Sequence, residues 1–98
     1  MNMQAMLKQA KKMQNDMMKV KEEIDNQIYE GKSSMVIVKL NGKKEVKDVK
    51  INLDKVDKED IEILEDMILV AFNEATKKID KDTEEKMGKY TKGMPGIF

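Results

Sequence analysis

Lysine is the residue type with the clearest binding chemistry in this sequence. All 19 basic residues are Lys, and none is Arg. Lys8, Lys11, Lys12 and Lys19 recur at spacings that place them on one face of a helix. An ammonium group attracts phosphate as a point charge, but it lacks the planar fork with which Arg binds guanine through two hydrogen bonds. This face is suited to a polyanion held by charge with weak sequence preference, although a solvated helix surface explains the same pattern.

Residue types typical of catalysis are scarce. The chain contains neither Cys nor His, so the commonest general base and the commonest pairs of nucleophile and base are missing. Neighbouring acids such as Glu84 and Glu85 diverge by about 100° on a helix and do not share a site. The sequence has no glycine-rich phosphate loop, zinc-ligand spacing or calcium loop. We therefore expect no enzyme, no cofactor and no metal site.

Length and composition predict one small cytoplasmic domain. The chain has 98 residues, of which 39% are charged and 40% hydrophobic. It shows no signal-peptide pattern and no apolar run long enough to span a membrane. Its zero net charge is unevenly spread: residues 1–24 carry five Lys against three acids, and residues 57–86 carry five Lys against eleven. Residues 87–98 carry two Lys and no acid, so both ends of the chain are basic and residues 57–86 are acidic.

A regular apolar stripe predicts a first helix over residues 2–26. The stripe repeats at spacings of three and four, as in a heptad seam, which needs a partner surface. We favour a seam shared with a second subunit over one that packs only on the chain's own second helix or sheet. The seam consists of Met3, Met6, Ala10, Met13, Met17, Val20 and Ile24.

The middle of the chain predicts three short antiparallel strands. Residues 27–32 and 35–40 form the first two, and Asn41-Gly42 favours a two-residue type I′ turn with positive φ at both positions. In the third strand Val46 is out of phase with Val49 and Ile51, which predicts a β-bulge near residues 47–48.

A second helix follows, with Asp57 as its predicted N-cap and Asp60 three residues on. Its apolar face is wide, and we expect it to end between Met87 and Tyr90. The fold class is α/β (α+β), a two-layer α-β-β-β-α domain with a three-stranded antiparallel sheet and two long helices. We assign residues 1–92 to the domain and 93–98 to a mobile tail.

Four stretches resemble the YbaB/EbfC family of bacterial nucleoid-associated proteins. They are MLKQAKKMQNDM (residues 6–17), VKLNGKKEVKDVKI (38–51), EDMILVAFNEA (65–75) and GMPG (93–96). The resemblance covers nearly the whole chain. It implies a cytoplasmic homodimer on the chromosome that binds double-stranded DNA through helices projecting from a sheet body, with roles in nucleoid organisation and gene expression. The residues it points to are Lys8, Lys11, Lys12, Lys19, Lys86, Lys89 and Lys92.

The absence of Arg departs from the mixture of Arg and Lys common in that family and argues against base-specific recognition.

Two further hypotheses stay open beside DNA binding. A protein–protein interaction module would use the Met-rich seam and the acidic second helix instead. A stable dimer whose function the sequence does not reveal is the third hypothesis.

Overall fold

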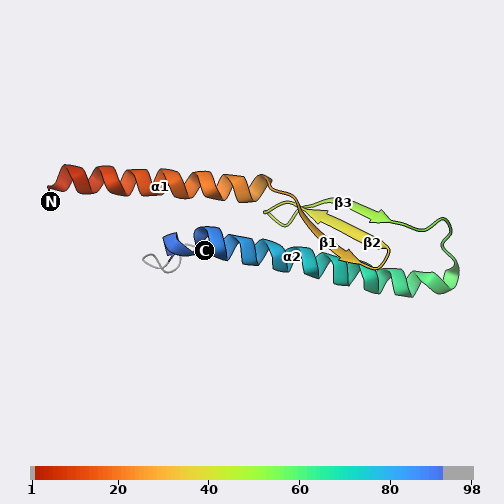
Figure 1. Cartoon of the computed structure of the whole chain (residues 1–98). Helices are drawn as coiled ribbons and strands as arrows, with labels where there is room; N and C mark the ends of the chain where they lie inside the picture. Colours follow the sequence, from red (N-terminus) through yellow and green to blue (C-terminus); the bar gives the residue numbers. More distant parts are fainter. Residues whose placement is uncertain (1, 92–98) are drawn as a thin grey trace.

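The computed structural model describes residues 2–91, and its elements follow the predicted α-β-β-β-α order (Figure 1). The molecule is elongated, with extents of 70 × 20 × 15 Å. The predicted domain boundary and tail at residues 93–98 lie outside the described residues. The elements are α1 (Met3–Asn26), β1 (Tyr29–Ser33), β2 (Val36–Leu40), β3 (Val46–Ile51), the short 3-10 helix η1 (Lys58–Asp60) and α2 (Ile61–Thr91).

Helix α1 has the predicted bounds. Asn2 caps it, since its side-chain oxygen accepts a hydrogen bond from the Ala5 N–H at 2.7 Å and so pairs one of the free donors of the first turn. At the other end the Gln27 N–H donates to the Ile24 carbonyl at 3.2 Å. Ile24 is the one buried residue of this helix, so most of α1 lies away from the core.

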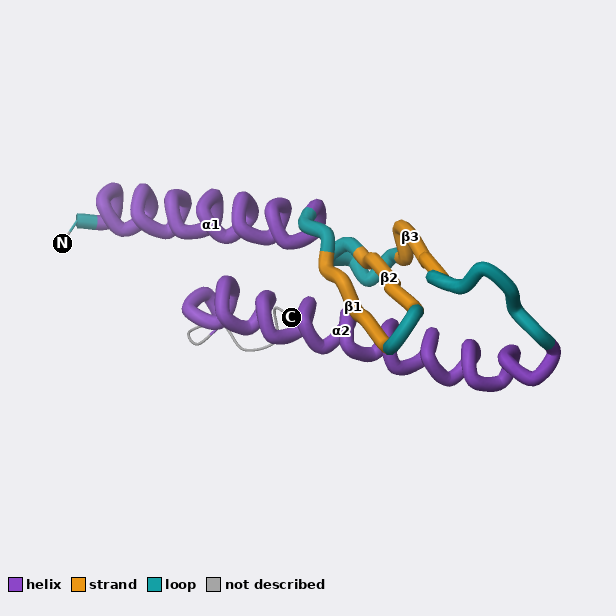
Figure 2. The backbone as a smooth tube through the Cα atoms, turned by 45° about the vertical axis from the view of Figure 1, so that its right-hand side comes forward, coloured by secondary structure: helices purple, strands orange, loops and turns teal. Residues whose placement is uncertain are grey.

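The sheet has the order β1-β2-β3, with both pairs antiparallel, and α2 covers β1 and β2 on one face (Figure 2). Val36, Val38 and Leu40 of β2 are almost fully buried beneath that helix. A Cβ atom at Gly31 would lie 1.8 Å from the Ala71 carbonyl oxygen. Only glycine at this position lets the helix backbone approach the first strand so closely.

The predicted bulge in β3 is confirmed. Lys39 pairs with Asp48 and Leu40 with Val46, so one extra residue lies between the two pairs. This shift puts Val46, Val49 and Ile51 opposite the buried residues of β2. However, among the described residues α2 does not pack on β3, and these three side chains remain exposed.

The predicted type I′ turn at Asn41-Gly42 is wrong. Residues 41–45 connect β2 to β3, and the left-handed residue is Lys44, with φ 66°. Asn41 closes a wider loop with its side chain, whose oxygen accepts hydrogen bonds from the Lys43 and Glu45 N–H groups. Asparagine favours both kinds of turn, and here the side-chain bonds select the longer one.

The second helical segment starts after Asp57, as predicted, but its first turn is a 3-10 helix and the α-helix follows it. Asp57 caps η1, where its N–H donates to the Asp60 carboxylate at 3.0 Å, and α2 begins at Ile61. The helix continues to Thr91, slightly beyond the predicted end. Its C-terminal half lies against α1 and contributes the buried residues Ile79 and Met87 to the core. Within the described residues, no helix is both long and apolar enough to cross a membrane.

Candidate nucleic-acid interface

Helix α1 and the C-terminal half of α2 lie side by side and project from the same end of the sheet (Figures 1 and 2). They run in opposite directions, and α1 extends further from the sheet. We call this pair the helical arm, comprising Met3–Asn26 and residues 76–91. Every described residue of α1 before Met17 is exposed, so the outer half of this helix is open to solvent.

The four predicted lysines of α1 are exposed and available. Lys8, Lys11, Lys12 and Lys19 form no ion pair or hydrogen bond with other described residues. Their ammonium groups are therefore free to approach phosphates. Helix α1 has no acid in its first turn, and its first acid is Asp16. The outer part of the arm is consequently its most positive part.

Two predicted lysines of α2 behave differently from one another. Lys89 is exposed and lies 5.0 Å above the ring of Tyr90. It shares a shallow hollow between the two helices with Lys12, so the fold brings together cations that are far apart in sequence. Lys86 instead turns towards the protein: its Nζ lies 3.0 Å from the Asp82 carboxylate and donates to the Gln27 side-chain oxygen at 3.2 Å. Lys92 lies outside the described residues.

Sequence reasoning missed a polar contact that joins β1 to α2 at the base of the arm. The buried Tyr29 donates its hydroxyl proton to Asp82 at 2.5 Å. Burial is the main cause that raises the pKa of Tyr29, and the Tyr29 hydrogen bond is the main cause that lowers the pKa of Asp82, with Lys86 adding to the second effect. The partners are 53 residues apart, and no local pattern signals such a pair.

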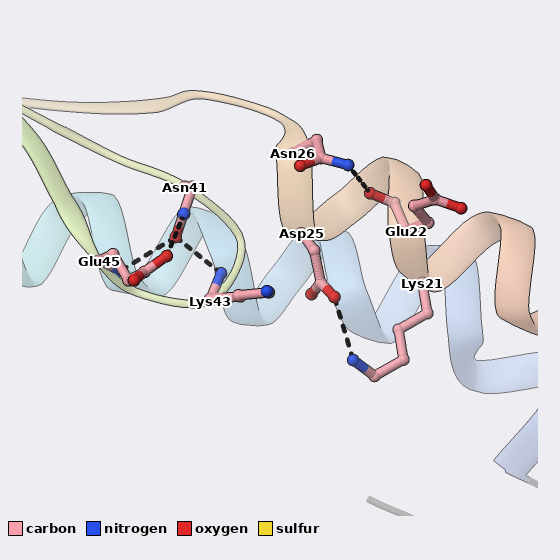
Figure 3. A network of polar contacts seen from close by, with 7 residues as sticks. All are labelled: Lys21, Glu22, Asp25, Asn26, Asn41, Lys43 and Glu45. Carbon is pink, nitrogen blue, oxygen red and sulfur yellow. Dashed lines mark hydrogen bonds and ion pairs between the residues drawn. The ribbon is translucent and has the colours of Figure 1, made fainter.

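The connection between β2 and β3 forms a second contact at the base of the arm. Figure 3 shows Asn41 facing Glu45 and Lys43 within the loop, beside the end of α1 with Asp25 and Asn26. The Gly42 N–H donates to the Asp25 carbonyl at 3.3 Å. At this helix end Lys21 pairs with Asp25 at 3.1 Å, and the Asn26 side chain donates to the Glu22 carbonyl at 3.0 Å.

The predicted seam is divided between the core and the surface. Ile24 is buried, and Met17 and Val20 pack partly against the core. Met3, Met6 and Met13 are exposed, with 77% of Met3 accessible. The inner half therefore packs against the chain's own core. Whether the outer half contacts a second subunit stays a prediction.

Within the described residues, no group of three or more His, Cys, Asp or Glu side chains is arranged to hold a metal ion. The site consists instead of exposed ammonium groups on paired helices. This arrangement can bind an extended polyanion electrostatically.

The profile of the YbaB/EbfC DNA-binding family matches residues 1–94. The chain belongs to this family. Its match spans both helices of the arm and the whole sheet, so the predicted resemblance is confirmed over nearly the full sequence.

Individual relatives agree with this assignment. A nucleoid-associated protein of Bacillus licheniformis is 54% identical and covers 99% of this chain and 94% of its own length. One from Lactococcus lactis subsp. cremoris is 47% identical, covering 97% and 98%. Another, from Ligilactobacillus salivarius, is 40% identical, covering 99% and 95%. The similarity to these proteins therefore extends along whole chains.

Proposed function

We propose that this YbaB/EbfC-family protein is a nucleoid-associated homodimer that binds double-stranded DNA through phosphates, with weak sequence preference. The observation that carries the proposal is the helical arm, on which Lys8, Lys11, Lys12 and Lys89 are exposed on two adjacent helices. Exposed Lys supplies the sequence-independent part of DNA affinity, and the missing Arg removes the commonest base-reading side chain. Its relatives' names place them at the nucleoid, which supports a role in chromosome organisation and gene regulation in the cytoplasm.

The lysines do not contribute equally in this proposal. Lys8, Lys11 and Lys12 are unpaired on the outer part of α1, and Lys89 lines the same hollow as Lys12. Lys86 already neutralises Asp82, so a phosphate would have to compete with that carboxylate for it. We therefore assign phosphate binding mainly to α1 and Lys89, and a structural role to Lys86.

The homodimer is proposed to form on the apolar surface that the single chain leaves open. Along residues 61–72 of α2 apolar side chains occur all round the helix, a pattern typical of buried helices, yet Ile63, Leu69 and Val70 are exposed. We include in this proposed surface the exposed residues Val49 and Ile51 of β3. We call these five residues the sheet-end surface.

Charge also favours a second copy on the sheet-end surface. The start of α2 is acidic, with residues such as Glu62, Glu65 and Asp66, whereas β3 and the residues around it carry Lys47 and Lys50. Two copies related by a two-fold axis could place the acidic helix of each beside the basic strand of the other. The outer half of the predicted seam on α1 is the alternative dimer surface.

A protein–protein interaction module is the second candidate function. The acidic first half of α2 and the exposed apolar side chains beside it would suit a partner protein with basic and apolar groups. In that case DNA binding would be incidental and would disappear near physiological salt.

The deciding experiment is a titration of the full-length protein into a fluorescent DNA duplex, followed by anisotropy at several salt concentrations. We expect micromolar or tighter binding, with log K falling linearly with log salt. A duplex of unrelated sequence should bind almost equally well. Absence of binding at low salt would contradict the proposal and favour the interaction module.

Triple substitution tests the assignment to α1. Lys8→Ala, Lys11→Ala and Lys12→Ala together should weaken binding, and the salt slope should fall by up to about 3 per chain, since each lost phosphate contact releases about 0.9 fewer counterions. The matched control replaces Lys32, Lys55 and Lys58, three exposed lysines outside the arm. Equal losses in both variants would show that net charge matters rather than the arm.

A further inference from the structure

The 41–45 loop is built around one buried polar side chain. Asn41 is 7% exposed and is the buried polar residue of the described core. Its side-chain oxygen accepts hydrogen bonds from the N–H groups of Lys43 and Glu45, both at 3.0 Å, and its Nδ2 donates to the Glu45 carboxylate at 2.7 Å. The main chain closes the same loop, because the Asn41 N–H donates to the Glu45 carbonyl at 3.0 Å. The side chain therefore fixes the shape of the whole loop (Figure 3).

This shape brings the loop onto the last turn of α1. The Gly42 N–H donates to the Asp25 carbonyl, one of the carbonyls that a helix end leaves without an intrahelical partner. The approach is close: a Cβ at position 42 would lie 1.9 Å from the Ile24 carbonyl oxygen. Gly42 is thus required for contact with α1, and its φ is not in the left-handed region.

The same loop also contacts α2. Lys44, at the left-handed position, forms an ion pair with Asp80 at 3.0 Å. One short loop therefore contacts both helices of the arm near its base. The inner part of α1 also packs on the core through Met17, Val20 and Ile24, and the loop adds polar contacts at the same end of the helix.

We propose that Asn41 is a positioning residue for DNA binding: by shaping the 41–45 loop, it holds α1 at a fixed angle to α2 and sets the spacing of the lysines on the arm. The link to DNA rests on the function proposed above. A lysine array that keeps its spacing can meet several phosphates at once, whereas a swinging α1 must lose that freedom on binding. Asn41 itself is buried and need not touch DNA.

The test measures the geometry of the arm without DNA. The chain has no Cys, so cysteines at Gln4 of α1 and Glu85 of α2 can carry two spin labels, and an excess of unlabelled chain prevents distances between labelled copies. Pulsed electron–electron double resonance then gives the distribution of distances between the labels. Asn41→Ala should broaden this distribution, and Asn73→Ala, at an exposed asparagine of α2, should not.

A rescue variant separates positioning from general damage. Asn41→Asp with Glu45→Gln exchanges donor and acceptor, because the new carboxylate at position 41 can accept from both N–H groups and from the new side-chain amide at position 45. This pair should restore the narrow distribution, whereas Asn41→Asp alone, which sets two carboxylates against each other, should not. Should Asn41→Ala fail to fold by circular dichroism, Glu45→Ala at an exposed position provides the same test with a smaller broadening.

Anisotropy with the same variants completes the test. We expect Asn41→Ala to bind the duplex at least about threefold more weakly at low salt, with a shallower salt slope, and the rescue pair to bind like wild type. An unchanged distance distribution would overturn the proposal, and so would a broadened distribution with unchanged DNA affinity. If wild type binds no DNA while Asn41→Ala still broadens the distribution, the proposed function fails but the control of the arm by Asn41 stands.

Discussion

At the scale of single residues, the base of the arm depends on a few polar contacts between distant segments. Tyr29, Asp82, Lys86 and Gln27 connect β1, α2 and the end of α1. The hydrogen bond to the ionised Asp82 is of the charge-assisted kind, and such bonds contribute about 1.5–3 kcal/mol when they are well formed. Lys86, a lysine expected to bind DNA, contributes to the fold through this group.

The pH dependence of stability should reveal the Asp82 contact. The folded state lowers the pKa of Asp82, so its contribution is present above the unfolded value of about 3.9 and is lost as pH falls through the lower folded value. Asp82→Asn should therefore lower the free energy of unfolding near neutral pH, and the difference from wild type should shrink below about pH 4. Urea unfolding at fixed protein concentration measures both.

A matched control for this prediction is Asp66→Asn, which replaces an exposed acid on the same helix. It should change the free energy of unfolding by less than about 0.5 kcal/mol. A difference between Asp82→Asn and wild type that stays constant from about pH 7 to about pH 2 would show that the lost interaction does not depend on the charge of Asp82.

At the scale of elements, local patterns determine much of this fold. The heptad spacing predicted α1 over residues 2–26, and the phase difference between Val46 and Val49 predicted the bulge. Each prediction concerns residues that are close in sequence, where periodicity and capping act directly. Residues 41–45 show the limit, since the conformation of Asn-Gly depends there on side-chain bonds and on contact with α1.

Contacts between elements were not predictable in the same way. The apolar face of β3 indicates a covered strand, but α2 reaches only β1 and β2, so the sequence pattern alone could not show where the cover ends. For the candidate site, helical spacing correctly placed the lysines of α1 on an exposed surface. It could not show that Lys86 pairs with Asp82 or that Lys12 lies beside Lys89, because both depend on how the helices pack.

The outer half of α1 should be dispensable for folding but not for binding. Deletion of residues 2–12 removes only exposed residues, so we expect the midpoint of urea unfolding to change little. The deletion also removes Lys8, Lys11 and Lys12, and DNA affinity should fall at least about tenfold at low salt. The triple Lys→Ala variant should reproduce most of that loss. A large loss of stability would instead indicate that the outer stripe packs on another surface.

At the scale of the whole molecule, the single chain leaves part of its apolar surface uncovered. A chain of 98 residues buries a modest fraction of its surface, and here Leu69 and Val70 of α2 and Val49 of β3 remain exposed outside the core. The outer part of the arm lies at one end of the molecule, and the sheet and the start of α2 lie towards the other (Figure 1). A dimer through the sheet-end surface would leave both arms free, whereas one through the outer seam of α1 would bring lysine-bearing helices together.

Matched substitutions decide between these two arrangements. Leu69→Gln with Val70→Gln removes apolar area from the sheet-end surface. Met3→Gln with Met6→Gln does the same on α1. All four side chains are exposed in the single chain, so neither double variant should damage its core. Sedimentation velocity over a concentration series measures the dimer. A fully buried Leu or Val contributes about 1.5–3 kcal/mol. The dissociation constant of the dimer should therefore rise at least about tenfold in the Leu69 and Val70 variant and stay at the wild-type value in the Met3 and Met6 variant.

The same two variants also relate assembly to DNA binding. A dimer joined at the sheet ends carries two arms, and linking them raises affinity because the second arm binds as an intramolecular event. Leu69→Gln with Val70→Gln should therefore reduce the number of phosphate contacts per binding unit by half, although it changes no lysine, and the salt slope measures that number. If the Met3 and Met6 variant alone becomes monomeric, the seam on α1 joins the subunits, and the two arms cannot bind DNA independently of one another.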